Sequence, residues 1–159
     1  MSDILYKTEH HVFSYRVAAV CIHNGCVLLQ KPVNDTAYAF PGGHVEFGET
    51  HEETLVREFR EEMGARLTVR ELKWVGELFF PWGERKCTQI CLYYDANVDG
   101  IPLSGKFTGC ESMDGRNFKM EFFWIPLDVI KNLEVYPTNA SEMLTKYDEG
   151  VQKFIYRED

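Results

Sequence analysis

The stretch GHVEFGETHEETLVREFREEMGA, residues 43–65, decides how the rest of the chain is interpreted. It predicts a helix over about 50–63, because Thr50 and Glu53 form a capping-box pattern and Gly64 stands where a left-handed C-terminal cap belongs. On a wheel of about 3.6 residues per turn, the apolar side chains share one side of this helix. That side can pack on a sheet, and it consists of Leu55, Val56, Phe59 and Met63.

The adjacent face of the predicted helix carries three carboxylates, Glu58, Glu61 and Glu62. Like charges at this spacing repel one another by about 0.2–0.5 kcal/mol per pair. The helix dipole also disfavours anions in the last turn by about 0.3–1 kcal/mol each. On the helix alone, two interpretations remain open. One is a solvated acidic face, and the other is a site for a divalent cation that prefers hard oxygen ligands, such as Mg²⁺ or Mn²⁺.

The residues before the helix decide between these interpretations. The loop from Pro41 to Glu49 contains three glycines, which permit unusual backbone angles and let the backbone approach a ligand closely. Loop and helix together complete the pattern G-x5-E-x7-R-E-U-x-E-E-x-G-U, where U is a bulky apolar residue. All seven fixed positions are filled, which chance would achieve about once in 10⁸ starts. The U positions hold an aromatic Phe59 and a small Ala65, both still apolar.

This pattern resembles the Nudix box of the Nudix hydrolases. Family features outside the box include Arg16, the run Val27-Leu28-Leu29, the lead-in from Tyr38 to Gly43 and the run from Trp124 to Leu127, so the resemblance covers roughly residues 15–130. It implies an α/β fold in which a mixed sheet is sandwiched between helices. The length of 159 residues predicts a single domain spanning 1–159, with its Nudix box at 43–65.

The resemblance also implies a metal site and its ligands. These are Glu58 and Glu62 as principal ligands, Glu61 in the same cluster, and the backbone carbonyl of Gly42. It further implies that Arg57 orients Glu61 and Glu49 through charge-assisted hydrogen bonds. The implied metal is Mg²⁺, with Mn²⁺ as the other suitable ion.

The general base is chosen from three carboxylates. Glu61 is the first choice, and Arg57 and Glu58 complete the expected catalytic set. Glu111 and Glu121 are the candidates for a base on a distant loop, although a carboxylate at either position is more typical of an ordinary surface residue.

Three further residues are candidates for contact with the substrate. Arg16 suits a phosphate, although a strand arginine equally suits pairing with a neighbouring carboxylate. Tyr38 and Phe40 have aromatic faces on which any nucleobase can stack. Aromatic residues in a lead-in of this kind are more commonly part of the core.

The implied reaction is metal-dependent hydrolysis of a diphosphate linkage in a nucleoside diphosphate joined to another moiety, such as a nucleotide, a nucleotide sugar or ADP-ribose. Two alternatives stay open. One is a non-catalytic nucleotide sensor on the same scaffold, which would typically lack one of the box carboxylates that are all present here. The other is a hydrolase or isomerase of a non-nucleotide diphosphate.

Composition narrows the class of partner. With 17 basic and 25 acidic side chains the net charge is −8, and there is no Lys/Arg run, which argues against a nucleic acid polymer. The expected partner is a small nucleoside diphosphate derivative, and homodimers are common in the family. The longest apolar run has six residues, against roughly 20 needed to span a bilayer, and the N-terminus lacks a signal-peptide pattern. The five cysteines form no C-x-x-C pair, which predicts reduced thiols in the cytoplasm and no zinc site.

The remaining elements follow from apolar alternation and turn residues. The Asn24-Gly25 pair predicts a hairpin turn. Segment 102–117 is glycine-rich and is interpreted as a long loop or a ragged hairpin, and no role is assigned to 131–159. The predicted strands cover 14–22, 26–30, 38–40, 67–80, 90–98 and 118–125, and short helices are expected near 126–130 and 141–147.

Overall fold

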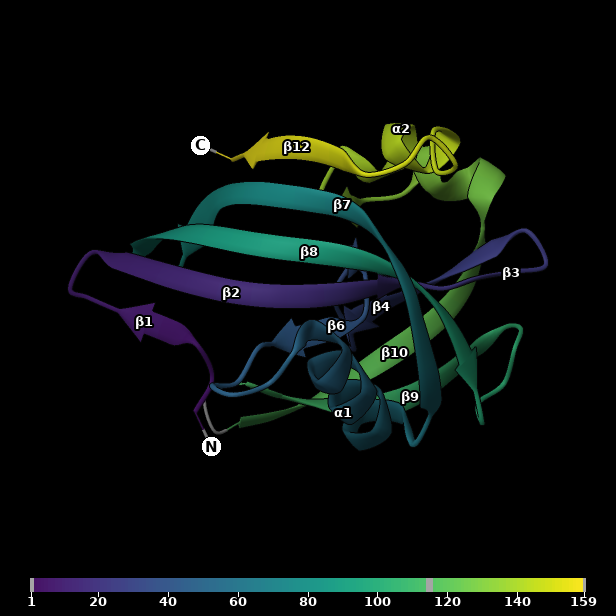
Figure 1. Ribbon diagram of the computed structural model, residues 1–159, viewed down its shortest axis with the longest axis horizontal. Helices are drawn as coiled ribbons and strands as arrows, with labels where there is room; N and C mark the ends of the chain where they lie inside the picture. The colour runs from purple at the N-terminus through teal and green to yellow at the C-terminus, as the bar shows by residue number, and fades with distance from the viewer. Residues whose placement is uncertain (1, 114–115, 159) are drawn as a thin grey trace.

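The computed structural model describes residues 2–113 and 116–158, without the side chains of 111–118. Within these residues the strands form two mixed sheets of six strands each (Figure 1). None of the helices in this part of the chain combines the length and the apolar character that crossing a membrane requires.

The first sheet has the strand order β1-β2-β8-β7-β12, and β6 pairs with the free edge of β2. Strands β2 and β8 run parallel, as do β7 and β12, while the other pairs are antiparallel. The bounds are β1 Leu5–Lys7, β2 His11–Val20, β6 Gly42–His44, β7 Arg66–Trp82, β8 Arg85–Asp99 and β12 Gln152–Arg157.

The second sheet has the order β11-β5-β4-β10-β9, with β3 paired to β4. The predicted turn between β3 and β4 is confirmed, because Asn24 and Gly25 both have positive φ, 49° and 73°. The bounds are β3 Ile22–His23, β4 Cys26–Pro32, β5 Tyr38–Ala39, β9 Lys106–Met113, β10 Arg116–Pro126 and β11 Val135–Tyr136.

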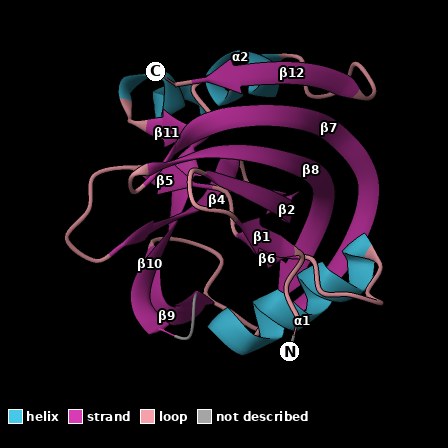
Figure 2. Cartoon of the chain, turned by 90° about the vertical axis from the view of Figure 1, so that its left-hand side faces the viewer, coloured by secondary structure: helices cyan, strands magenta, loops and turns pink. Residues whose placement is uncertain are grey.

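The helices lie on opposite sides of the strands. Figure 2 shows α1 (His51–Met63) on one side, and α2 (Ala140–Thr145) on the other. The 3₁₀ helix η1 (Leu127–Asn132) follows β10 and packs beside α2. The predicted α/β class with a mixed sheet between helices is therefore confirmed, with the strands divided between two sheets.

The ends of α1 follow from its sequence. The Thr50 hydroxyl accepts a hydrogen bond from the Glu53 backbone N–H, and the Glu53 carboxylate accepts one from the Thr50 N–H at 2.9 Å. Gly64 ends the helix with φ of 67°, in the left-handed region that glycine adopts without strain. Leu55 and Phe59 are fully buried and anchor the helix in an apolar cluster to which both sheets contribute.

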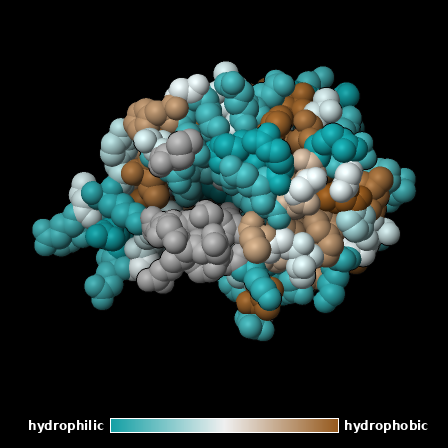
Figure 3. Space-filling view, turned by 90° about the horizontal axis from the view of Figure 1, so that it is seen from below, coloured by the Kyte–Doolittle hydropathy of each residue, from teal (hydrophilic) through white to brown (hydrophobic). Residues whose placement is uncertain are grey.

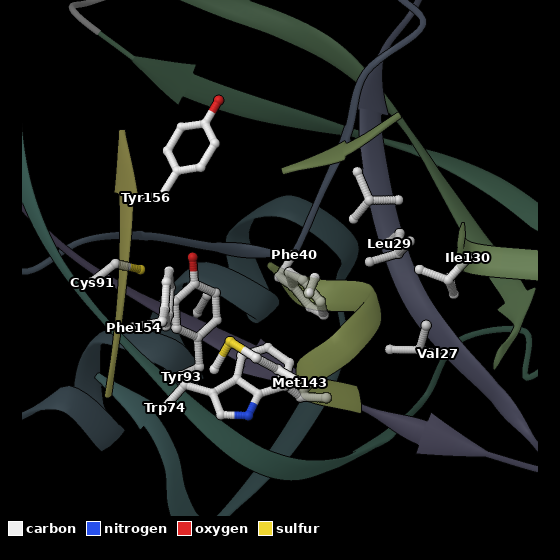
Figure 4. Packing of buried hydrophobic residues seen from close by; sticks show 14 of the residues in the cluster. Val27, Leu29, Phe40, Trp74, Cys91, Tyr93, Ile130, Met143, Phe154 and Tyr156 are labelled. Carbon is white, nitrogen blue, oxygen red and sulfur yellow. The ribbon is translucent and has the colours of Figure 1, made fainter. Parts of the chain in front are cut away.

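The buried apolar residues form two clusters. In the cluster shown in Figure 4, the rings of Phe40, Trp74 and Tyr93 meet edge to face or tilted, with centroids 5.3–5.7 Å apart. Edge-on contacts of this kind stabilise the core by about 0.5–1.5 kcal/mol per pair beyond area burial. Tyr156 of β12 joins the same cluster, and its hydroxyl points away from these rings.

The glycine-rich segment and the C-terminal residues are more regular than the sequence suggests. Of the two alternatives for 102–117, the structure takes the hairpin, in which β9 pairs with β10. Strand β9 packs against the last turn of α1, where a Cβ at Gly109 would stand 2.2 Å from the carbonyl oxygen of Glu62. Glycine at this position therefore allows the strand and the helix to pack closely.

Candidate functional site

The guanidinium of Arg57 organises the loop before α1. It binds Glu49 through both carboxylate oxygens, with Nε 2.7 Å from Oε2 and Nη2 3.0 Å from Oε1. It also donates to Glu58 at 2.7 Å and to Glu61, one turn further along the helix, at 3.4 Å. The Arg57 side chain is only 15% exposed. The resemblance implied that Arg57 orients Glu49 and Glu61, and the structure brings these three residues together.

Glu46 adds a fourth carboxylate, 3.3 Å from Nη2 of Arg57. We call Arg57 and its four partners, Glu46, Glu49, Glu58 and Glu61, the acidic cluster. When ionised, four carboxylates against one guanidinium leave three negative charges without compensation. This cluster lies on the α1 side of the molecule, whose surface is mostly hydrophilic (Figure 3).

The field of the acidic cluster extends to the N-terminal residues. The backbone of Asp3 pairs with that of Glu46 in an isolated antiparallel β-bridge. Burial raises the pKa of Asp3, and the negative charges of Glu46 and Glu58 raise it further. The cluster therefore already disfavours another anion, and a cation placed there would be attracted.

Arg57 has the opposite effect on Glu49. Its hydrogen bonds lower the pKa of Glu49 from 4.5 to about 2, outweighing the partial burial of the carboxyl group, and the Thr54 hydroxyl donates a further bond at 2.8 Å. Glu49 is thus ionised at every pH at which the protein would operate, and it holds Arg57 in place.

This coupling predicts a specific loss of stability in acid. Because the folded-state pKa of Glu49 is depressed, its contribution is complete above about pH 4.5 and is lost as the pH falls toward 2. Over that window the free energy of unfolding of the native protein is expected to fall by about 3 kcal/mol more than that of Glu49→Gln. Urea denaturation of both proteins at several pH values measures the difference. Parallel pH profiles would contradict the assignment.

Gly43 holds the Glu58 side chain against β6. A Cβ at Gly43 would stand 2.3 Å from Cδ of Glu58, so only glycine leaves room for the carboxylate. Gly42 is equally constrained, because its Cβ would stand 2.0 Å from the carbonyl oxygen of Val17. The two glycines thus bring backbone and carboxylate oxygens close together beside α1.

The three helix carboxylates have different surroundings. The Glu58 side chain is 16% exposed and that of Glu61 is 56% exposed, whereas Glu62 is 6% exposed. The helical wheel places them on one face, but it does not include β9, whose Gly109 lies against the backbone carbonyl of Glu62 at the end of α1. Sequence spacing therefore gave the direction of these side chains and not their exposure.

The donor set suits a hard divalent cation. It offers carboxylate and carbonyl oxygens, the ligands that Mg²⁺ and Mn²⁺ prefer, beside an uncompensated negative charge. The cradle at Gly43 gives one of these carboxylates a fixed place. Among the described residues, no three His, Cys, Asp or Glu side chains are already gathered closely enough to hold a metal ion by themselves.

A cavity of about 750 Å³ adjoins the acidic cluster, a size typical of small-molecule sites. His44 connects the two: its carbonyl accepts from Arg57 at 3.4 Å, and its side chain lines the cavity. Arg16 lies opposite His44 in the register of β2 and β6 and also lines the cavity. Aromatic residues supply much of the wall: Phe40, Phe80, Trp82, Tyr93, Tyr136 and Tyr156.

Two of the three candidate substrate contacts line the cavity, and the third does not. Arg16 and Phe40 line the cavity, although Phe40 is only 1% exposed and also belongs to the core. Tyr38 packs edge to face on Phe123 in the second sheet. Because Tyr38 lies outside the cavity lining, a stacking role for it gains no support.

The candidates for a distant base gain no support either. Glu121 pairs with Lys31 at 3.0 Å and with Lys106 at 3.5 Å, and the bond from Lys31 is the main cause that lowers its pKa. These contacts fit the surface role that the sequence analysis favoured. The side chain of Glu111 lies outside the described part of the structure.

The sequence analysis missed several residues of this region. Glu46 and His44 lie inside the recognised motif at positions that its pattern leaves open, so no spacing rule identifies them. Glu134, Tyr136, Tyr156 and Glu158 line the cavity from the segment to which no role was assigned. The short run Phe154-Ile155-Tyr156, of aromatic and β-branched residues, was the one available signal for β12.

Comparisons with known proteins show which proteins this chain is similar to. Residues 13–147 match the family model described as NUDIX domain. A nucleoside triphosphatase, NudI of Enterobacter sp. (strain 638), is 30% identical over 141 residues, covering 85% of this chain and 95% of that protein. An RNA pyrophosphohydrolase of Acinetobacter baylyi is 51% identical over 41 residues, which is 26% of this chain. The crystal structure of a MutT protein from Bacillus halodurans superimposes with a TM-score of 0.62 at 19% identity and covers 92% of both chains.

Proposed function

Because the chain belongs to the Nudix hydrolases, enzymes that act on phosphorus-containing acid anhydrides, we propose that it hydrolyses a diphosphate linkage in a nucleoside triphosphate or a related nucleoside diphosphate derivative, with Mg²⁺ as its metal. The relative NudI, which matches 85% of this chain, is named a nucleoside triphosphatase and supports this substrate class. A single observation carries the proposal: His44 joins the acidic cluster to a cavity of about 750 Å³.

The charge of the cluster makes a cation necessary for binding. A polyphosphate is strongly anionic, and three uncompensated carboxylates would repel it. Glu58, Glu61, Glu62 and the carbonyl of Gly42 would hold the metal. When bound, Mg²⁺ neutralises charge on the diphosphate and lowers the pKa of a water ligand.

The chain's own residues position and activate the attacking water. Glu49 and Glu46 fix the Arg57 guanidinium, which in turn holds Glu58 at 2.7 Å. Glu61 is the carboxylate of this cluster with the greatest exposure, so it is accessible to a water molecule and suits the role of general base. Arg57 is a positioning residue for both carboxylates.

The cavity would hold the nucleoside. Arg16 and His44 lie at the end nearest the acidic cluster, where they suit contact with phosphate oxygens. Trp82 and Phe80 stack on each other at the wall and offer an apolar surface for a base or ribose. The substrate would therefore lie with its phosphates toward α1 and its base along the aromatic wall of the cavity.

The test is a phosphate- and pyrophosphate-release screen of the purified protein with nucleoside triphosphates, ADP-ribose, nucleotide sugars and dinucleotide polyphosphates. Hydrolysis of a nucleotide is expected with Mg²⁺, and removal of the metal by EDTA is expected to reduce turnover at least about a hundredfold, because metal-assisted stabilisation of the developing charge is lost. Adding back Mg²⁺ should restore it.

Three other results would contradict the proposal. Undiminished hydrolysis in EDTA would remove the metal from the mechanism. Tight nucleotide binding without turnover would indicate a sensor. Turnover of isopentenyl diphosphate in place of any nucleotide would indicate a non-nucleotide substrate.

A further inference from the structure

The far end of the cavity is built by the C-terminal part of the chain. Strand β11 and the residue before it contribute Glu134 and Tyr136, and strand β12 and the residue after it contribute Tyr156 and Glu158. Asp35, from the loop before β5, also lines this end. Three carboxylates and two phenols thus stand opposite Arg16 and His44.

Each glutamate of this end is oriented by a tyrosine. The Tyr136 hydroxyl donates to Glu134 Oε2 at 2.9 Å, and the Tyr156 hydroxyl donates to Glu158 Oε1 at 2.6 Å. The two tyrosine rings meet edge to face at 5.9 Å, which ties the two pairs together. The backbone N–H of Glu158 is also anchored, because it donates to the Phe79 carbonyl at 2.8 Å. These carboxylates are therefore held in defined directions.

Orientation by tyrosine leaves the carboxylates able to accept more hydrogen bonds. An ionised carboxylate has about four acceptor positions and no donor. Burial and the bond to Glu158 raise the pKa of Tyr156, so its phenol stays a donor to that carboxylate. The Thr36 hydroxyl donates to the other oxygen of Glu134 at 3.1 Å, which fixes that group further.

The chemistry of this end is selective in two ways. Three negative charges repel a phosphate group, which favours the opposite end, where Arg16 lies. A group with N–H donors can pair with a carboxylate. A carbonyl oxygen at the same place would face only acceptor lone pairs and would find no donor on these carboxylates.

We propose that Glu134 and Glu158 select nucleobases that present an exocyclic amino group over bases that present a carbonyl at the same position. This inference rests on the proposed function. Adenine and cytosine belong to the first class, and hypoxanthine and uracil to the second. The aromatic wall accepts any base by stacking, so the carboxylates supply the discrimination.

The test compares two matched nucleotide pairs, CTP with UTP and ATP with inosine triphosphate, in the presence of Mg²⁺. The kcat/KM of the amino-bearing member is expected to exceed that of its partner by about tenfold in each pair. In E134Q/E158Q the side-chain amides can donate to a carbonyl, so kcat/KM should rise for UTP and inosine triphosphate. The CTP/UTP and ATP/inosine triphosphate ratios of kcat/KM should therefore fall toward one. A purely structural effect would lower all four values together.

The control variant is E142Q, which removes an exposed carboxylate of α2 that pairs with Lys146 and does not line the cavity. Its ratios should equal those of the unmodified protein. Equal kcat/KM values within both pairs would overturn the inference and leave the proposed function standing. If no nucleotide is hydrolysed, the proposed function fails. The inference is then tested by calorimetric Kd values for the same four nucleotides. A tenfold preference for the amino-bearing members supports the inference, and equal or absent binding overturns it.

Discussion

Glu58→Gln is expected to lower kcat at least about a hundredfold while leaving the fold intact. The substitution removes one negative charge from the acidic cluster and replaces a hard anionic ligand by a neutral amide. Glutamine keeps the shape of the side chain and an oxygen that accepts from Arg57, so the cradle at Gly43 remains filled. Steady-state kinetics with Mg²⁺, together with thermal unfolding, separates lost chemistry from lost stability.

A matched control lies on the same helix. Glu52→Gln removes an exposed carboxylate in the first turn, which is not one of the acidic residues around Arg57 and is not the capping-box glutamate. Its kcat should stay within about twofold of the unmodified protein. If Glu58→Gln retained full activity, Glu58 would not be a metal ligand.

Arg57→Met is expected to have the largest effect on stability. It leaves Glu46, Glu49, Glu58 and Glu61 facing one another without their shared cation. Removing one partner from a buried ion-pair network costs about 3 kcal/mol or more, which for a chain of this size lowers Tm by roughly 6–12 °C. Differential scanning calorimetry at neutral pH measures the shift, and turnover should fall as well, since the carboxylates lose their orientation.

The pH dependence of the stability loss tests this prediction further. Without Arg57 the pKa of Glu49 is no longer held near 2, so the carboxyl groups of the variant protonate at higher pH and their repulsion disappears. The stability difference between the variant and the native protein should therefore shrink as the pH falls from about 4.5 to 2. Arg66→Met serves as the control, because its ion pair with Asp99 is largely exposed and contributes at most about 1 kcal/mol. A similar loss in both variants would contradict a special role for Arg57.

The part of the site that the sequence predicted is the part encoded within one turn of helix or one short loop. Capping by Thr50 and Gly64, and the reach of Arg57 to Glu61, follow from fixed helical spacing. The carboxylate roles came from the resemblance of 43–65 to a known box, since spacing alone left a solvated acidic face equally open.

The remainder depends on contacts between distant parts of the chain. Glu62 is buried where the end of α1 meets β9, and β9 lies in a glycine-rich segment that is typical of a loop. The cavity joins Arg16 of β2 to Tyr156 of β12, and no local pattern relates these positions. Propensity describes each strand separately, whereas a cavity wall arises only when strands far apart in sequence pair.

Strand β12 also determines which backbone groups the first sheet leaves open. It pairs in parallel with β7 from Gln152 to Arg157 and so satisfies amide groups that would otherwise be a template for another polypeptide. Strand β12 is therefore an edge strand of this sheet. Its exposed side chains include the positively charged Lys153 and Arg157, and Phe154 turns inward toward the core. Charged side chains on an edge strand oppose the addition of a further strand.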